Sequence, residues 1–253
     1  MKIAQFCAEF ERRFPPPVRN RPMPLYSLRF KVKIKRLYVN YYLFDPLRDV
    51  EGMISVKKQR LLQLAYAHVE PNEAYLEIGT WQGKSLIAAM RGNPPRPTFA
   101  CDNFSEWNHS KGQHAHPREA FLQNLQRYGL AEHVRFYDAP FQQIMTADKL
   151  PVPIGLYFYD AAHDEQSQYE GITLAEPFLA DEALVLIDDW RYAEDSRAYA
   201  KAGTERAMAE SRNRWTLLQE LPARYNGDRA LWWNGMAVLG FQRLRASHHS
   251  CPK

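Results

Sequence analysis

Short apolar runs alternate with amphipathic segments along the chain from residue 54 onward. Nearly continuous apolar runs of this length are typical of the buried strands of a parallel sheet. The segments between them repeat apolar residues at helical spacing, which predicts an α/β domain with helices on both faces of the sheet. The expected strands are 74–79, 98–102, 134–139, 154–163 and 183–190, and the expected helices are 54–68, 84–90, 118–128 and 166–178.

The C-terminal part of the pattern differs, because two apolar runs follow each other without a helix between them. A helix is expected over 197–212, and the two runs are 215–221 and 236–241. Such a pair predicts an antiparallel hairpin at the edge of the sheet. The expected fold class is therefore α/β, with a mostly parallel, seven-stranded, Rossmann-like sheet that ends in an antiparallel C-terminal hairpin.

The N-terminal segment differs in charge from the rest of the chain. Residues 1–60 hold 14 Lys and Arg against 5 Asp and Glu, a net charge of +9, whereas the remainder carries −5. Basic and apolar residues alternate over 29–42, which predicts a strand with one polar face. We expect residues 1–53 to form a basic, aromatic extension that serves as a lid or dimer arm. Residues 54–245 are expected to form the core domain, and residues 246–253 a disordered tail.

Composition argues against several classes of protein. No apolar run approaches the ~18–20 residues needed to span a bilayer. The N-terminus has acids and arginines where a signal peptide needs an apolar stretch. Three distant cysteines, Cys7, Cys101 and Cys251, form neither a disulfide framework nor a metal motif. We therefore expect a cytoplasmic protein without membrane association.

The most informative segment joins the first core strand to its helix and reads Glu77-Ile78-Gly79-Thr80-Trp81-Gln82-Gly83-Lys84-Ser85. Open parallel sheets bind ligands at the carboxyl ends of their strands. Gly79 allows a sharp turn there, and Gly83 allows the chain to pass close to a ligand. The helix that begins near Lys84 directs unpaired N–H groups to the same place.

Three kinds of cofactor compete for this loop. Gly83-Lys84-Ser85 ends like a P-loop, but three residues separate the two glycines where the Walker A motif needs four. The G-x-G-x-x-G motif of NAD(P) sites is absent. The spacing E-x-G-x-x-x-G resembles motif I of S-adenosylmethionine (SAM) dependent methyltransferases, and this resemblance implies that the loop lines the methionine part of SAM. A glycine turn without a ligand is the structural alternative.

Acidic residues end the next two strands. Asp102 follows the glycine loop by ~20 residues, where a carboxylate accepts hydrogen bonds from both ribose hydroxyls. Asp138-Ala139 resembles the acidic-plus-small pair that borders the adenine in class I methyltransferases. The resemblance to that class covers residues 54–241 and implies its Rossmann-like fold and a SAM site. The implied cofactor residues are Glu77, Gly79, Thr80, Trp81, Gly83, Ser85, Asp102, Asn103, Asp138 and Ala139.

Three further carboxylates, Asp160, Asp188 and Asp189, end two neighbouring strands. Adjacent strand ends lie ~5 Å apart, so such like charges oppose each other's ionisation unless a cation lies among them. Carboxylate oxygens suit Mg²⁺ or another divalent cation such as Mn²⁺ or Ca²⁺. The sequence therefore predicts a metal site held by these three residues, with a helix cap at Asp188 and Asp189 as the alternative.

This arrangement resembles the metal-dependent O-methyltransferases, among them catechol O-methyltransferase and the macrolide sugar O-methyltransferases. Asp160-Ala161-Ala162-His163 also resembles the D-G-x-H run of a group that includes proteins named for cephalosporin hydroxylase, with Ala161 in place of the glycine. His163 stands where catechol-type enzymes have a lysine base, and histidine accepts a proton near neutral pH. The resemblance implies metal-assisted O-methylation of a small hydroxylated acceptor (a sugar, polyketide or phenol), with Asp160 and His163 catalytic.

Functions of other classes stay open at this point. The basic segment 19–36 is compatible with RNA binding or RNA methylation, although no RNP-like or zinc-finger signature accompanies it. We therefore expect a small-molecule partner rather than nucleic acid. A fold that has lost its chemistry would act as a binding or assembly subunit. The basic, aromatic arm is also compatible with a homodimer.

Overall fold

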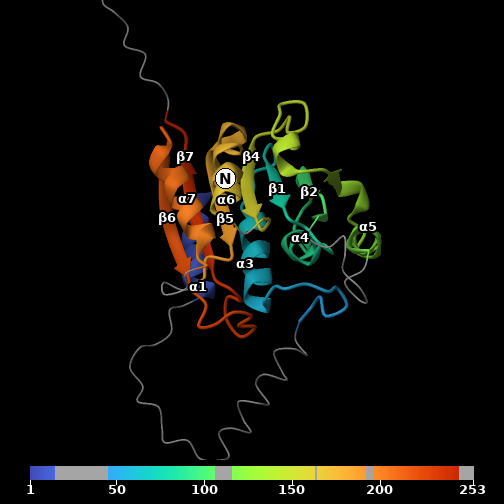
Figure 1. Ribbon diagram of the computed structural model, residues 1–253. Helices are drawn as coiled ribbons and strands as arrows, with labels where there is room; N and C mark the ends of the chain where they lie inside the picture. The colour runs from blue at the N-terminus through green and yellow to red at the C-terminus, as the bar shows by residue number, and fades with distance from the viewer. Residues whose placement is uncertain (15–44, 106–115, 163, 192–196, 245–253) are drawn as a thin grey trace, which may run out of the picture.

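The computed structural model describes residues 1–14, 45–105, 116–162, 164–191 and 197–244. Within these ranges, seven strands form one sheet in the order β3-β2-β1-β4-β5-β7-β6 (Figure 1). Strands β1 to β5 pair in parallel, and β7 pairs antiparallel with both β5 and β6, which confirms the predicted fold class. The strands are β1 (Ala74–Ile78), β2 (Thr98–Asp102), β3 (Val134–Asp138), β4 (Ile154–Tyr159), β5 (Leu179–Asp188), β6 (Arg214–Leu221) and β7 (Met236–Gln242).

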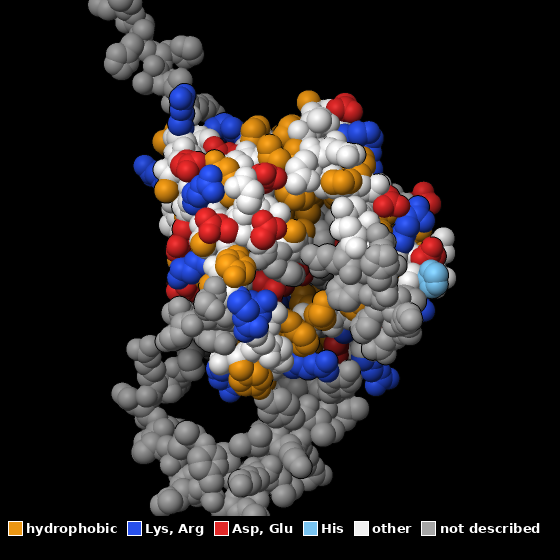
Figure 2. Space-filling view, in the orientation of Figure 1, with side chains coloured by type: hydrophobic (Ala, Val, Ile, Leu, Met, Phe, Trp, Pro, Cys, Tyr) orange, Lys and Arg blue, Asp and Glu red, His pale blue; other side chains and the backbone are white. Residues whose placement is uncertain are grey.

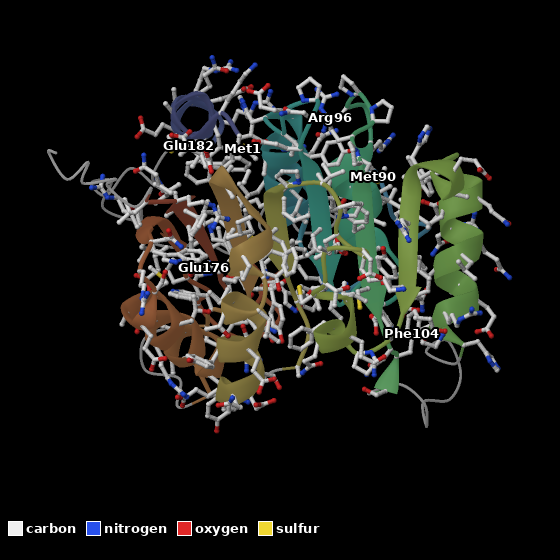
Figure 3. The ribbon with its side chains drawn as sticks, turned by 90° about the horizontal axis from the view of Figure 1, so that it is seen from above. Met1, Met90, Arg96, Phe104, Glu176 and Glu182 are labelled. Atoms are coloured by element: carbon white, nitrogen blue, oxygen red, sulfur yellow. The ribbon has the colours of Figure 1, made fainter. Side chains whose placement is uncertain are left out.

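Helices lie on both sides of the sheet, as the view from above shows (Figure 3). Two of them begin at side-chain caps, because Ser55 accepts a hydrogen bond from the Lys58 backbone N–H and Asp164 accepts one from that of Ser167. The helices are α1 (Ile3–Arg13), α3 (Val56–Ala67), α4 (Lys84–Met90), α5 (Pro117–Arg127), α6 (Glu165–Thr173) and α7 (Tyr199–Glu210), and short 3₁₀ segments are Ala131–His133, Phe141–Ile144 and Glu176–Phe178.

Alternation along the central strands separates two hydrophobic cores, because successive side chains of a strand point to opposite faces of the sheet. On one face, Leu156 of β4 and Leu184 of β5 belong to the core that includes Leu61 of α3. On the other face, Tyr157 and Val185 belong to the core beneath α6 and α7. The strands are therefore covered on both faces, as their nearly continuous apolar sequences predict.

Helix α1 adds to the core in a way that the sequence analysis did not anticipate. It buries Phe6 and Phe10 in the core that contains α3, and the Met1 ammonium group forms an ion pair with Glu73. The first part of the segment 1–53 thus packs against the sheet domain. The predicted strand over 29–42 and the tail 246–253 lie outside the described residues, so the role of lid or dimer arm stays a prediction.

On the face shown in the space-filling view, basic and acidic side chains of the described residues are interspersed (Figure 2). None of the helices in the described ranges combines the length and the apolar composition that crossing a bilayer requires.

Candidate active site

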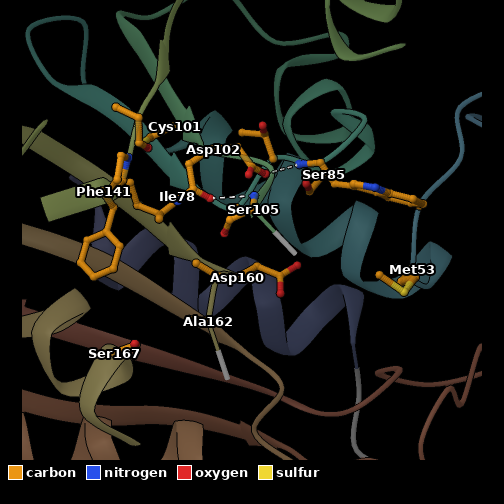
Figure 4. A pocket seen from close by; sticks show the side chains of 18 of the residues that line it. Met53, Ile78, Ser85, Cys101, Asp102, Ser105, Phe141, Asp160, Ala162 and Ser167 are labelled. Atoms are coloured by element: carbon orange, nitrogen blue, oxygen red, sulfur yellow. Dashed lines mark hydrogen bonds between the residues drawn. The ribbon is translucent and has the colours of Figure 1, made fainter. Parts of the chain in front are cut away.

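A cavity of about 250 Å³ opens at the carboxyl ends of β1, β2 and β4. This is the edge at which open parallel sheets bind their ligands, and the volume is just below the ~300–1,000 Å³ of typical ligand pockets. Asp160 and Asp102 lie across the pocket from each other, with Met53 at one end and Phe141 at the other (Figure 4). Eight of the predicted site residues line the cavity, namely Gly79, Thr80, Trp81, Ser85, Asp102, Asn103, Ala139 and Asp160.

Other predicted residues lie near this cavity but do not line it. Glu77 is buried beneath it, and Gly83 packs against Phe121, because a Cβ at Gly83 would lie 2.9 Å from that ring. Asp138 is exposed and accepts a hydrogen bond of 2.6 Å from the Arg118 side chain. These contacts indicate that Glu77 and Gly83 stabilise the conformation of the loop and do not themselves contact a ligand.

The glycine loop has the geometry that its sequence demands. Gly79 and Gly83 have φ of 86° and 87°, a region that favours glycine. Trp81, between them, has φ 42°. Its backbone N–H donates to Asp102 across the strand ends at 2.8 Å, so the carboxylate of β2 stabilises the loop that follows β1.

Asp102 and Thr80 provide polar groups suited to an adenosyl ligand. Besides the Trp81 N–H, Asp102 accepts a hydrogen bond from the Phe104 N–H at 2.7 Å. A carboxylate has about four acceptor positions, and its oxygens are suited to accepting hydrogen bonds from ribose hydroxyls. The Thr80 hydroxyl is buried and has no hydrogen-bond partner within the described ranges. Buried polar groups are normally paired, and a ligand in the cavity would provide the partner.

Glu77 forms a buried network beneath the loop. The Ser85 hydroxyl donates to one of its oxygens at 2.6 Å, and the Tyr75 hydroxyl donates to the other. Burial, and next the charge of Asp102, raise the pKa of Glu77 to about 8, although both hydrogen bonds act in the opposite direction. The network links β1 to the first turn of α4.

The three carboxylates predicted to bind metal have separate partners. The Lys58 ammonium forms a buried ion pair with Asp188. Asp189 accepts hydrogen bonds from Arg191 at 3.1 Å and from Asn234 at 2.8 Å. Only Asp160 lines the cavity. Burial, followed by the charges of Asp188 and Asp189, raises the pKa of Asp160 well above its usual range, and Lys58 acts against this shift.

These contacts do not fit the predicted metal site. Among the described residues, no three His, Cys, Asp or Glu side chains gather as a set that could hold a metal ion. The physical reason is that cationic side chains already compensate two of the carboxylates: Lys58 pairs with Asp188, and Arg191 pairs with Asp189. That Asp160, Asp188 and Asp189 surround one divalent cation therefore stays a prediction, which these contacts do not favour; the charges of Asp188 and Asp189 contribute to raising the pKa of Asp160.

Lys58 is the site residue that the sequence analysis missed. Its side chain is fully buried, and charged residues are rarely buried without a partner. The signal is present in α3, where Lys58 precedes Leu61, Leu62 and Ala65 at the spacing i, i+3, i+4 and i+7 that defines one helix face. This signal is weak, because a lysine in an amphipathic helix is ordinarily solvated. His163, the predicted base, lies outside the described residues.

Comparison with known proteins agrees with this geometry. A family described as a methyltransferase domain matches residues 76–190, and no curated protein matches the chain. Cofactor-bound Rv0187 from MTB is 22% identical at a TM-score of 0.54, covering 84% of this chain and 91% of that one. An O-methyltransferase from Bacillus cereus in complex with SAH is 18% identical in sequence at a TM-score of 0.51, and the match covers 95% of this chain and 100% of that one. TomG from Streptomyces achromogenes, an O-methyltransferase in complex with SAM, is 18% identical in sequence at a TM-score of 0.53, and the match covers 96% of this chain and 100% of that one.

The family match and the fold together confirm the resemblance to class I SAM-dependent methyltransferases. The part that matches the methyltransferase-domain family begins within β1 and ends directly after Asp189. At these identities the structural neighbours establish the fold.

Proposed function

We propose that the protein is a SAM-dependent O-methyltransferase that acts on a small hydroxylated acceptor. The observation that carries the proposal is the placement of two carboxylates on opposite sides of one cavity, Asp102 at the end of β2 and Asp160 after β4. The first lies where a ribose is expected, and we assign the second to the acceptor hydroxyl. Several structural neighbours are described as O-methyltransferases, and TomG is described as involved in tomaymycin synthesis.

The residues of the cavity fit SAM better than a triphosphate. The loop between Gly79 and Gly83 is one residue shorter than a Walker A loop, and the ammonium group of Lys84, which lines the cavity, is paired with Asp45 at 2.8 Å. The Asp102 carboxylate would repel a polyanion in the same cavity. SAM has ribose hydroxyls, which need hydrogen-bond acceptors, and a sulfonium cation, which is favoured by negative charge. The carboxylate in the cavity provides both.

When bound, SAM supplies an electrophilic methyl group on a sulfonium sulfur. Transfer of this methyl group from sulfur to an acceptor oxygen would require that the hydroxyl proton leave. In our proposal Asp160 holds the acceptor hydroxyl, and His163, three residues further along, receives the proton as general base. Asp102 and the glycine loop fix the cofactor, so that orientation provides part of the rate enhancement. No step passes through a metal ion, because two of the carboxylates are compensated by Lys58 and Arg191.

Calorimetric titration with SAM and, separately, with ATP tests the cofactor. We expect SAM to bind at one site per chain and ATP to show no binding at the same concentrations. Tight ATP binding without SAM binding would contradict the proposal and favour the P-loop alternative.

A panel of hydroxylated sugars, phenols and polyketides, assayed with radiolabelled SAM, then tests the transfer step. Asp160→Asn should reduce transfer by about 100-fold or more, while SAM still binds. SAM binding without transfer to any member of a broad panel would favour a non-catalytic subunit.

A further inference from the structure

Strand geometry directs two of the carboxylates at the same helix. Leu156 and Phe158 of β4 belong to the core on the α3 side of the sheet, and Asp160 follows them at the next position of the same alternation. Leu184 and Leu186 of β5 lead in the same way to Asp188. The register pairs Tyr159 with Ile187, so Asp160 and Asp188 come next to each other at the end of the sheet.

Lys58 comes from the helix that faces these two residues. It is in the first turn of α3, its side chain is 0% exposed, and its ammonium group pairs with Asp188. Taking a lysine out of water costs several kcal/mol unless an anion compensates it. Lys58 thus places a cation at a position of the buried face of α3 where an apolar side chain would be expected. Its position therefore points to a requirement for positive charge among the carboxylates.

A second cation, Arg191, pairs with Asp189, the residue after Asp188. Arg191 and Asn234 bind the two oxygens of Asp189, and the Arg191 backbone N–H donates to the Asn234 carbonyl at 2.6 Å. These contacts connect Asp189 to the loop before β7 rather than to the cavity. Asp188 and Asp189 each have a side-chain cation, and Asp160 is the member of the trio that lines the pocket.

We propose that the Lys58 ammonium group takes the place that a divalent cation would occupy beside Asp160 and Asp188, so that the enzyme transfers methyl groups without a metal. The inference rests on the proposed function in that it concerns the same catalytic pocket. Lys58 is a positioning residue: it acts on Asp160 and Asp188 and lies below the cavity. A single ammonium group does not chelate two vicinal oxygens as a metal ion does. The acceptor therefore needs only one hydroxyl.

Binding of Mn²⁺ tests this proposal independently of the acceptor. Mn²⁺ prefers carboxylate oxygens, and its free concentration is measured by electron paramagnetic resonance. The wild-type protein should bind no stoichiometric Mn²⁺ at this site. The Lys58→Gln substitution removes the competing charge, so the variant should bind Mn²⁺ at least about tenfold more tightly than the wild-type protein does. Asp160→Asn in the Lys58→Gln background should abolish this gain.

Lys57→Gln is the matched control, because Lys57 is the adjacent residue but lies over the Trp232 ring, 5.6 Å from its centroid, and not at the carboxylates. It removes the same charge and should leave Mn²⁺ binding at the wild-type level. Circular dichroism establishes that each variant is folded. If Lys58→Gln does not fold, the wild-type titration decides alone: no bound ion supports the proposal, and one bound ion per chain overturns it.

Two results would overturn the proposal. One is a wild-type protein that binds one Mn²⁺ per chain and loses it in Asp160→Asn. The other is a folded Lys58→Gln variant that binds none, because no cation position would then exist. SAM titrations on the same samples report the proposed function separately. If the wild-type protein does not bind SAM, the proposed methyltransferase function is wrong, whereas the Mn²⁺ results test the role of Lys58 alone.

Discussion

The backbone carbonyl oxygen of Asp160 lies 1.8 Å from the position that a Cβ atom on Gly79 would occupy. The end of β4 and the turn after β1 are therefore in contact through backbone alone, and the Asp160 N–H also donates to the Ile78 carbonyl at 2.9 Å. This contact places a carboxylate of β4 against the cofactor loop. It explains in physical terms why the first glycine of the motif cannot carry a side chain.

Gly79→Ala should therefore damage both stability and cofactor binding. The added methyl group clashes with a backbone atom that cannot rotate away, and alanine is also strained at φ +86°. We expect the free energy of unfolding to fall by about 3 kcal/mol or more. Urea denaturation measures the stability, and calorimetry should show SAM binding weakened or lost.

Gly129→Ala is the control for backbone strain without the clash. Gly129 has φ +68°, and no atom of the described residues beyond its chain neighbours lies within 4 Å of the position that its Cβ would take. The substitution should cost only the ~1–2 kcal/mol of a left-handed residue and leave SAM affinity unchanged. Equal effects of the two substitutions would show that the contact with Asp160 contributes nothing.

Asp102→Asn tests the carboxylate at the end of β2. The substitution preserves the shape but replaces one acceptor oxygen by a donor, so contacts with the Trp81 N–H and with ribose hydroxyls are weakened. We expect SAM to bind about 10- to 100-fold more weakly. Asp138→Asn is the matched control on the next strand, because Asp138 is exposed and pairs with Arg118. A stronger effect at Asp138 than at Asp102 would reverse our assignment of these two carboxylates.

Local patterns were sufficient to predict much of the sheet. The parallel strands β1 to β5 all end at the ligand edge, so Asp102 at the end of β2 and Asp160 directly after β4 could be assigned from sequence. Lys58 could not be assigned in this way, because its meaning depends on Asp188, 130 positions away. A lysine in an amphipathic helix is ordinarily solvated, and only the packing of α3 on the sheet shows that this one is buried.

Helix α1 shows a similar limit of sequence reasoning. Ile3, Phe6, Cys7 and Phe10 have helical spacing, but the basic residues and the proline-rich break that follow made the whole segment resemble an extension. The helix is stabilised by burial against residues far along the chain. Its stability therefore comes from tertiary packing rather than from local propensity.

Phe6→Ala tests whether α1 belongs to the core. Phe6 is fully buried, and truncation of a buried phenylalanine typically lowers the free energy of unfolding by about 3–5 kcal/mol. Leu217→Ala is the comparison, because Leu217 is 43% exposed on β6. This substitution should lower the free energy of unfolding by less than about 1 kcal/mol. Chemical denaturation measures both. A Phe6→Ala protein as stable as the wild type would mean that α1 is not docked.

The raised pKa of Glu77 makes stability depend on pH in a definite direction. An unfolded chain releases this proton near the ordinary value of 4.5, whereas the folded protein retains it up to about 8. Between these values the folded state binds more protons, so the free energy of unfolding falls as pH rises, by up to about 1.4 kcal/mol per pH unit from this group. Glu77→Gln has no proton to release and should reduce that slope.

Denaturation curves at intervals from pH 5 to pH 8 measure the difference between the wild type and Glu77→Gln. Other buried carboxylates titrate in both proteins, so the difference isolates Glu77. Glutamine also preserves an acceptor for the Ser85 hydroxyl. Glu182→Gln, at an exposed position of β5, removes a carboxylate from the surface and should leave the slope as it is. If the stability gap between wild type and Glu77→Gln does not shift in favour of the variant as pH rises, Glu77 is ionised in the folded protein and the burial argument for its pKa is wrong.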